Sequence, residues 1–209
     1  MAVVITIAQQ KGGTGKTTLA ANLGAALAGR NRVALLDIDP QRSLTRWHSL
    51  RAARADTAPL LTFSDVSGWR LATELDWLKQ DHDVILIDSP PQIDTDAKLA
   101  VRGANLVLVP VQPSPPDVWA AEGTLKLAAD ERRRAAIVLN RVPPVSHLKA
   151  VLAADLATRG RTLLRSSIGN RAGFANAFSE GLGVTEAAPR SSAAREVRSL
   201  LDEIVEMIR

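Results

Sequence analysis

The stretch Gln10-Lys11-Gly12-Gly13-Thr14-Gly15-Lys16-Thr17-Thr18 decides the fold of this chain. An apolar run, Val3-Val4-Ile5-Thr6-Ile7-Ala8, precedes it, and a helix-like run rich in alanine and leucine follows over 19–28. Strand, glycine loop and helix in this order form a phosphate cradle, because glycines let successive backbone N–H groups turn inward and the helix N-terminus adds partial positive charge. The sequence therefore predicts a nucleoside triphosphate site.

Two lysines and a threonine carry the predicted chemistry of this loop. Lys16 is placed to reach the β- and γ-phosphates, and the Thr17 hydroxyl to bind Mg²⁺. The loop departs from the pattern G-x-x-x-x-G-K-[ST], because Gln10 stands where the first glycine belongs and Lys11 adds a second lysine. Lys11 either neutralises phosphates in its own loop or reaches those of a facing subunit. A solvated turn is disfavoured by the flanking strand and helix.

Length and composition bound the class of protein. The chain has 209 residues, of which 46% are hydrophobic and 3% aromatic, and it contains no cysteine. We expect one α/β domain over 1–209 with a core of Ala, Val, Leu and Ile, and no disulfide or cysteine metal site. Neither a signal peptide nor an apolar run of roughly 18 residues is recognisable, which predicts a cytoplasmic protein without a membrane segment.

The net charge of +4 is unevenly distributed along the chain. Residues 1–130 carry 13 Lys and Arg against 14 Asp and Glu, whereas residues 131–209 carry 13 against 8. Such asymmetry can mark a polyanion-binding face. An arginine-rich solvated surface explains the composition equally well.

Apolar runs alternate with helical patterns throughout the sequence. Strands are expected over 3–8, 32–37, 60–65, 83–88, 105–111, 135–140 and, from a weaker signal, 162–166. Helices are expected over 17–29, 41–54, 67–80, 94–102, 116–132, 147–158, 171–180 and 190–208. Several strands are apolar at successive positions, which is typical of burial between two helical layers. The order predicts an α/β fold with a doubly wound, mostly parallel sheet, helices on both faces and ligands at the strands' carboxyl ends.

Acidic residues end two of these strands. Asp37 and Asp39 follow the run Val33–Leu36, and strand alternation predicts that they share a face. Asp88 follows another apolar strand in the same way. Carboxylates beside a phosphate loop suit Mg²⁺ coordination and the orientation of an attacking water. Asp39 has a structural alternative, because Asp followed by Pro is a good N-cap for a helix beginning near Gln41.

Together these motifs resemble the ParA/MinD group of P-loop ATPases, which carry a deviant phosphate loop. The matching segments are 11–18, 37–41, 87–91, 109–114, 140–141, 184–186 and 192–197. Because they extend through nearly the whole chain, the resemblance implies the P-loop NTPase fold and Mg²⁺-dependent hydrolysis of ATP.

The resemblance also implies roles for individual residues. ATP binding would close a homodimer in which Lys11 reaches the partner's phosphates, and Lys16 and Asp39 would complete the catalytic set, Asp39 by orienting water. Thr17, Asp37 and Asp88 would hold or support the metal. Residues expected to contact the nucleotide, the last three around the adenine, are Gly12, Gly13, Thr14, Gly15, Lys16, Thr17, Thr18, Pro110, Gln112 and Asn140.

The chain is most similar to the small plasmid-partition members without an N-terminal helix-turn-helix domain. The acidic run Leu200–Arg209 argues against a MinD-like membrane helix, because anionic lipid would repel it, and favours packing on the sheet. Nonspecific, salt-sensitive DNA binding through phosphates is expected instead. The candidate DNA-binding residues are Arg165, Arg171, Arg190, Arg195 and Arg198.

The expected function is therefore ATP-dependent positioning or segregation of a cargo on the nucleoid. A small adaptor, either a ParB-like centromere-binding protein or a cargo adaptor, would stimulate hydrolysis. The cargo is a plasmid or chromosome or, alternatively, a protein assembly such as a chemoreceptor cluster or carboxysome. An amidase-type synthetase or a metal-cluster carrier is disfavoured, because the former often uses, and the latter requires, cysteines that this chain lacks.

Overall fold

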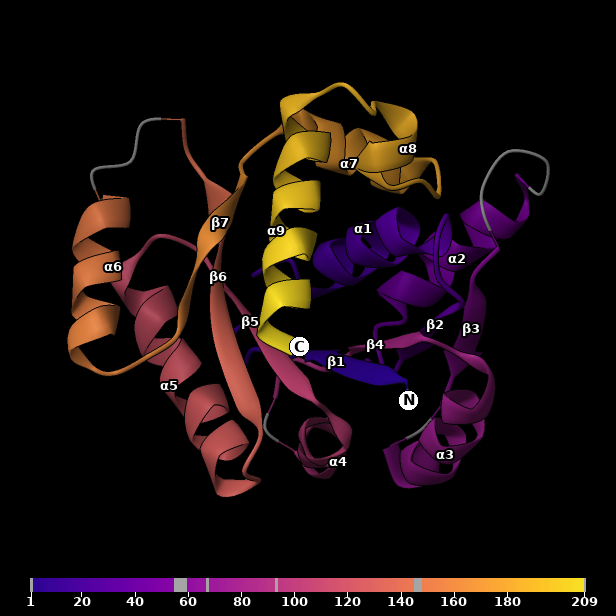
Figure 1. Cartoon of the computed structure of the whole chain (residues 1–209), viewed down its shortest axis with the longest axis horizontal. Coiled ribbons are helices and arrows are strands. Elements are labelled where there is room, and N and C mark those ends of the chain that lie inside the picture. The colour runs from indigo at the N-terminus through magenta and orange to yellow at the C-terminus, as the bar shows by residue number, and fades with distance from the viewer. Residues whose placement is uncertain (1, 55–59, 67, 93, 145–147, 209) are drawn as a thin grey trace.

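Seven parallel strands form one sheet in the order β3-β2-β4-β1-β5-β6-β7 (Figure 1). The computed structural model describes residues 2–54, 60–66, 68–92, 94–144 and 148–208. The strands are β1 (Val3–Ile7), β2 (Val33–Asp37), β3 (Thr62–Asp65), β4 (Val84–Asp88), β5 (Leu106–Val111), β6 (Arg134–Val142) and β7 (Leu163–Gly169). Each predicted strand is present, including the weakly signalled β7, and all neighbours pair in parallel.

The helices also follow the predicted order. They are α1 (Lys16–Ala28), α2 (Ser43–Ala52), α3 (Leu71–Asp81), α4 (Thr95–Gly103), α5 (Pro115–Asp130), α6 (Leu148–Thr158), α7 (Ala172–Ser179), α8 (Val184–Ala187) and α9 (Ser192–Ile208). A 3₁₀ turn, Gly68–Arg70, leads into α3. The short helix α8 is absent from the sequence-based expectation, because one turn is too short to produce a periodic pattern.

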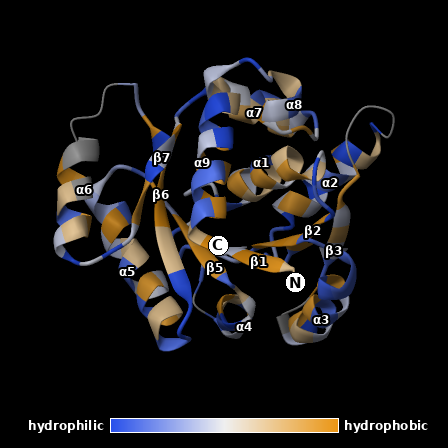
Figure 2. Ribbon diagram, in the orientation of Figure 1, coloured by the Kyte–Doolittle hydropathy of each residue, from blue (hydrophilic) through white to orange (hydrophobic). Residues whose placement is uncertain are grey.

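Successive residues of the strands point to opposite sides of the sheet and enter different cores. Ile5 and Leu86 pack with α1, α2, α7, α8 and α9, whereas Val4 and Ile85 pack with α3 and α4. A further core joins β5 and β6 to α5 and α6. The central strands are therefore hydrophobic along their length, as Figure 2 shows for β1 and β5. Helical layers on both faces confirm the doubly wound fold.

The C-terminal helix α9 packs on the sheet, as its apolar stripe predicts. Its buried side is formed by Ala193, Ala194, Val197, Leu200 and Ile204. Within the described ranges, no helix combines the length and the apolar character needed to cross a bilayer.

The strand register brings the predicted site residues to one edge of the sheet. Asp88 at the end of β4 is level with Ile7 of β1 on one side and Asp37 of β2 on the other. The phosphate loop follows β1, which lies between β4 and β5. The loop and the acidic strand ends therefore meet at the carboxyl edge, where ligands of such sheets bind.

Candidate functional site

The phosphate loop turns through two glycines in the left-handed region. Gly13 has a φ of +77° and Gly15 a φ of +91°, conformations that other residues rarely adopt. Gly15 also has no room for a side chain, because a Cβ there would lie 2.4 Å from Nδ2 of Asn140. Gly15 caps α1, and its carbonyl accepts the first helical bond, from the Leu19 N–H at 2.9 Å. The first-turn N–H groups of α1 thus face the loop and are available to an anion.

Side chains from distant strands brace the carbonyl groups of this loop. Asn140 Nδ2, in β6, donates to the Thr14 carbonyl at 2.7 Å, and Gln112 Nε2, after β5, donates to the Gly13 carbonyl at 3.2 Å. These two bonds fix the orientation of two peptide groups of the loop. Asn140 and Gln112 are expected around the adenine from the family resemblance, and their contacts with the loop carbonyls were not predicted, because no local sequence pattern encodes them.

The structure also explains the missing first glycine. The Gln10 side chain lies against α5 where that helix has Gly123, since a Cβ on Gly123 would fall 1.7 Å from Gln10 Nε2. Glycine is unfavourable in a helix interior, and here its small size leaves room for the Gln10 side chain. The close approach of residues 10 and 123 is visible only in the fold.

Lys16 is buried beside two carboxylates. Only 6% of the residue is exposed, and burial lowers the pKa of its ammonium group, while the charges of Asp88 and Asp39 oppose that shift. Because burying an ammonium group is costly, an anion that binds beside Lys16 would offset part of that cost.

Asp88 is the most perturbed acid of the site. It is fully buried, and burial raises its pKa to about 8, with the Thr17 hydroxyl partly opposing the shift and the charge of Asp37 adding to it. Within the described part of the chain, neither carboxylate oxygen has a hydrogen bond of good geometry. Two bare, buried oxygens beside the Thr17 hydroxyl suit a hard divalent cation such as Mg²⁺.

A protein cage around such a cation is not required. Among the described residues, no group of three or more His, Cys, Asp or Glu gathers to hold a metal. Mg²⁺ is commonly bound by one or two carboxylates together with substrate phosphates and water. The donor set of Asp88 and Thr17 therefore fits an ion that arrives with a nucleotide.

Asp37 has a different environment from Asp88. Burial raises its pKa, but the N–H and hydroxyl groups of Thr45 both donate to Oδ2, at 2.9 and 2.8 Å, and the Asp39 N–H donates to Oδ1 at 3.1 Å. These bonds attach the end of β2 to the first turn of α2 and shape the turn that carries Asp39. Metal support by Asp37 stays a prediction, while its observed contacts are structural.

Asp39 is not the helix cap that its Pro neighbour suggests. Its Oδ1 accepts the Gln41 N–H at 2.9 Å within a turn, and α2 begins only at Ser43 after Arg42, whose φ is +53°. Strand β2 ends at Asp37, so the shared-face argument from alternation does not extend to Asp39. The half-buried Asp39 lies beyond the strand, close enough for its charge to act on Lys16.

Lys11 does not turn toward its own loop. Its Nζ donates to Oδ2 of Asp117, in the first turn of α5, at 2.7 Å. In the nucleotide-free chain, Lys11 therefore does not point toward the predicted phosphate site of its own loop.

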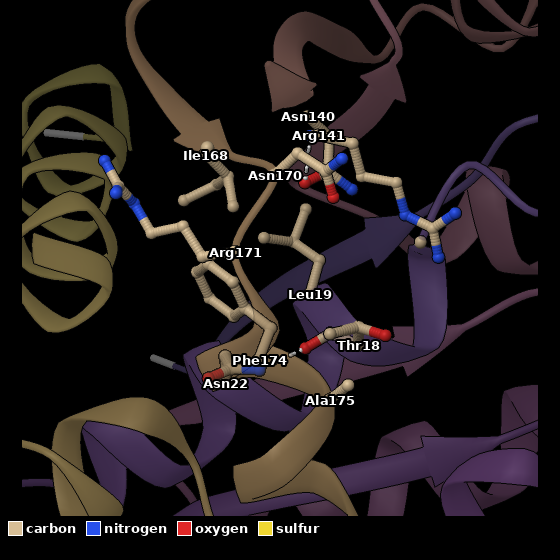
Figure 3. A pocket seen from close by; sticks show the side chains of 12 residues that line it. Thr18, Leu19, Asn22, Asn140, Arg141, Ile168, Asn170, Arg171, Phe174 and Ala175 are labelled. Atoms are coloured by element: carbon tan, nitrogen blue, oxygen red, sulfur yellow. Dashed lines mark hydrogen bonds between the residues drawn. The ribbon is translucent and has the colours of Figure 1, made fainter. Parts of the chain in front are cut away.

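A cavity of about 150 Å³ opens beside the loop, between α1, α7 and the ends of β6 and β7 (Figure 3). Leu19, Ile168 and Phe174 give it an apolar wall, and Asn140 and Asn170 supply amides at its rim. An apolar slot with a few amide groups suits a planar heterocycle such as a nucleobase. Pro110 and Gln112, expected near the adenine, are not among the lining residues.

The five candidate DNA-binding arginines fall into two groups. Arg165 pairs with Glu203 and Glu206, and Arg171 extends from the cavity toward α9 to pair with Glu196 at 2.6 Å (Figure 3). The other three, for which the described residues show no ion pair, are Arg190, Arg195 and Arg198. Arg195 and Arg198 donate to neutral oxygens, Ser192 Oγ and the Pro189 carbonyl. Their positive charge is therefore not neutralised locally.

Comparison with known proteins agrees with this geometry. The family model described as CobQ/CobB/MinD/ParA nucleotide binding domain matches residues 5–184. The chain is 33% identical to maintenance of carboxysome distribution protein A of Halothiobacillus neapolitanus, over 98% of this chain and 97% of that protein. It is 30% identical to Protein ParA of Rhizobium radiobacter, over 85% and 83% of the two chains.

A solved structure shares the fold at lower identity. A putative plasmid partition protein from Borrelia burgdorferi, bound to AMPPNP, superposes with a TM-score of 0.82 at 19% identity, over 99% of this chain and 100% of that one. The family match and the relatives confirm the resemblance drawn from the motifs. The chain belongs to the CobQ/CobB/MinD/ParA family of nucleotide-binding domains.

Proposed function

We propose that this protein is a Mg²⁺-dependent ATPase that dimerises on ATP, binds DNA nonspecifically and positions a cargo. The observation that carries the proposal is the meeting of a glycine loop, the buried Lys16 and the bare carboxylate of Asp88 at one edge of the sheet. Burying the Lys16 ammonium and the Asp88 carboxyl group is costly, and a metal–triphosphate would offset the cost of both. Residues 1–209 would act as one P-loop domain.

The proposed chemistry is positioning and charge neutralisation rather than covalent catalysis. The loop N–H groups and Lys16 would bind the β- and γ-phosphates, and Thr17 and Asp88 would hold Mg²⁺. The metal, when bound, would neutralise charge that develops on the phosphates. Asp39, on its partly exposed turn, would orient the attacking water, with Asp37 fixing that turn.

The base of the nucleotide would lie in the cavity between α1, α7 and β7. Leu19 and Phe174 offer apolar contacts there, and the amide of Asn170 offers hydrogen bonds. Asn140 would serve both the cavity and the loop, because it lines the first and braces the second. This single residue would couple occupation of the base site to the shape of the phosphate site.

Cargo positioning is supported by what the relatives' names describe. One is named for carboxysome distribution and another is called ParA, while the solved structure is titled a putative plasmid partition protein. We favour nonspecific DNA as the track, on the nucleoid, and a small adaptor protein that stimulates hydrolysis. The first candidate cargo is a plasmid or chromosome. The second is a protein body such as a carboxysome, which the name of the 33% identical relative favours.

Retention on DNA tests this function directly. The protein is incubated with nonspecific duplex DNA and with Mg²⁺ plus ATP, ADP or no nucleotide, and the bound fraction and oligomeric state are measured. Retention and dimerisation are expected only with ATP, and Lys11→Ala is expected to lose both. Lys126→Ala, which removes an exposed lysine of α5, is the matched control. Equal retention under all three conditions would contradict the proposal.

Co-purification with ATP present then separates the two cargo classes. A small basic DNA-binding adaptor indicates partition of a DNA molecule. An adaptor that binds a protein shell or receptor array indicates positioning of a protein assembly.

A further inference from the structure

The ion pair between Lys11 and Asp117 joins two very different environments. The Lys11 side chain is 43% exposed, whereas that of Asp117 is 4% exposed. Ser114, the N-cap of α5, donates its hydroxyl to the same Asp117 oxygen, Oδ2, and accepts the Asp117 N–H at 3.3 Å. The other oxygen, Oδ1, is buried without a hydrogen bond in the described part of the chain.

Because of this difference in exposure, separating the pair costs Asp117 more free energy than it costs Lys11. If the pair separates, Lys11 can be hydrated. Among the described residues, the buried Asp117 carboxylate then retains only the Ser114 hydroxyl and the N-terminal end of α5 as stabilising groups. Breaking a pair around a buried charge costs more than breaking an exposed one. The contact therefore favours the conformation in which Lys11 stays with its own chain.

We infer that Asp117 is the intramolecular counter-ion that holds Lys11 back until a second copy of this chain presents a triphosphate. The inference rests on the proposed function, in which Lys11 reaches the partner's phosphates. Lys11 would then exchange one anion for another, and the exchange becomes more favourable as the charge of the incoming phosphates increases. Asp117 is thereby a positioning residue that raises the threshold for dimerisation.

Asp117→Asn tests the role of this charge with little change of shape. Asparagine keeps a side-chain acceptor beside Ser114, but it neither attracts Lys11 as an ion nor leaves a buried charge when Lys11 departs. With a nonhydrolysable ATP analogue and Mg²⁺, the dimer dissociation constant from sedimentation is expected to fall about fivefold or more, since two such pairs open per dimer. The adaptor-independent rate of ATP hydrolysis is expected to rise with it.

Three variants show whether the effect passes through Lys11. Asp117→Glu retains the charge and is expected to stay near wild type. Asp130→Asn removes an exposed acid at the other end of α5 and is expected to change nothing. In a Lys11→Ala background, Asp117→Asn is expected not to restore dimerisation, because the lysine it would release is absent, and recovery of dimerisation would show that Asp117 acts without Lys11.

Failure of this inference is distinguishable from failure of the proposed function. If wild type dimerises with the analogue, Lys11→Ala does not, and Asp117→Asn is unchanged or weaker, then Asp117 does not restrain Lys11. If wild type and Lys11→Ala both stay monomeric, the proposed function itself is wrong. If the asparagine variant does not fold, amine labelling of the nucleotide-free wild type tests the inference instead. Lys11 should react several-fold more slowly than Lys126, and equal rates would overturn the inference.

Discussion

The phosphate loop and the β7–α9 region both contain many charged residues, but these residues differ in their burial and in their partners. Around the loop, Lys16 and Asp88 are buried, and the oxygens of Asp88 lack hydrogen bonds in the described structure. In the β7–α9 region, Arg165 and Arg171 are paired with glutamates of α9. Buried ionisable groups whose oxygens lack hydrogen bonds indicate a candidate ligand site, whereas paired surface charges contribute little to binding or stability.

The comparison also corrects what net charge suggests. The excess of basic residues after 130 is compatible with a polyanion-binding face or with a solvated surface, and part of this charge is neutralised within the chain. Among the five candidate DNA-binding arginines, the charge that remains available is that of Arg190, Arg195 and Arg198, which contact solvent or neutral oxygens. The location of charge, rather than its sum, determines where a polyanion can bind.

Removing the buried cation of the loop is expected to have the largest effect. Lys16→Ala deletes the ammonium predicted to bind the phosphates, and it leaves Asp88 without its nearest positive charge. We expect ATP affinity, measured by calorimetry with Mg²⁺, to fall about 100-fold or more, and hydrolysis to be lost. Lys126→Ala should bind ATP as wild type does. ATP binding by Lys16→Ala at wild-type strength would show that the loop is not the phosphate site.

Asp88→Asn is expected to change the pH dependence of stability in the nucleotide-free protein. The pKa of Asp88 is raised to about 8, so the folded state holds a proton that the unfolded chain releases at about pH 4. The free energy of unfolding therefore falls as pH rises from about 4 to about 8. The asparagine variant should lose most of that decline, and exceed wild type at pH 8 by roughly a few kcal/mol.

Urea denaturation at about pH 5 and pH 8, without Mg²⁺, measures this difference. Asp130→Asn, at an exposed position, serves as the control and should keep the wild-type slope. A wild-type slope in Asp88→Asn would mean that another group carries the pH dependence; Asp37, whose pKa burial also raises, is the first to examine.

Neutralising surface arginines is expected to have the smallest effect on function. The effect on DNA binding should differ between the arginines that are paired with glutamates and those that are not. Removing Arg195 and Arg198 together should weaken ATP-dependent DNA binding by up to about tenfold at roughly 0.1 M salt, and lower the salt slope by about two. Arg165→Ala should change affinity less than about twofold, because its charge is already paired. Fluorescence anisotropy with a nonspecific duplex measures both. A larger effect from Arg165 would indicate that DNA displaces Glu203 and Glu206.

Much of this arrangement follows from local sequence. The apolar strands, the glycine loop and the acids that end β2 and β4 were identifiable because backbone preferences and burial act over a few neighbouring residues. The prediction was wrong where a contact with a residue outside the local motif changed the structure that the motif suggests. Asp39 followed by Pro resembles an N-cap. In the structure, however, Asp37 accepts hydrogen bonds from Thr45, and α2 begins at Ser43.

The sequence by itself determined the strand order along the chain, the phosphate loop and the identities of the charged groups, since each depends on short-range pattern. Only the tertiary structure decided which groups meet. Asn140 braces the loop from β6, Gly123 makes room for Gln10, and Asp117 holds Lys11 across 106 positions. Such contacts depend on how the sheet and helices pack, and a side chain's partner in space leaves no signature in its neighbours along the chain.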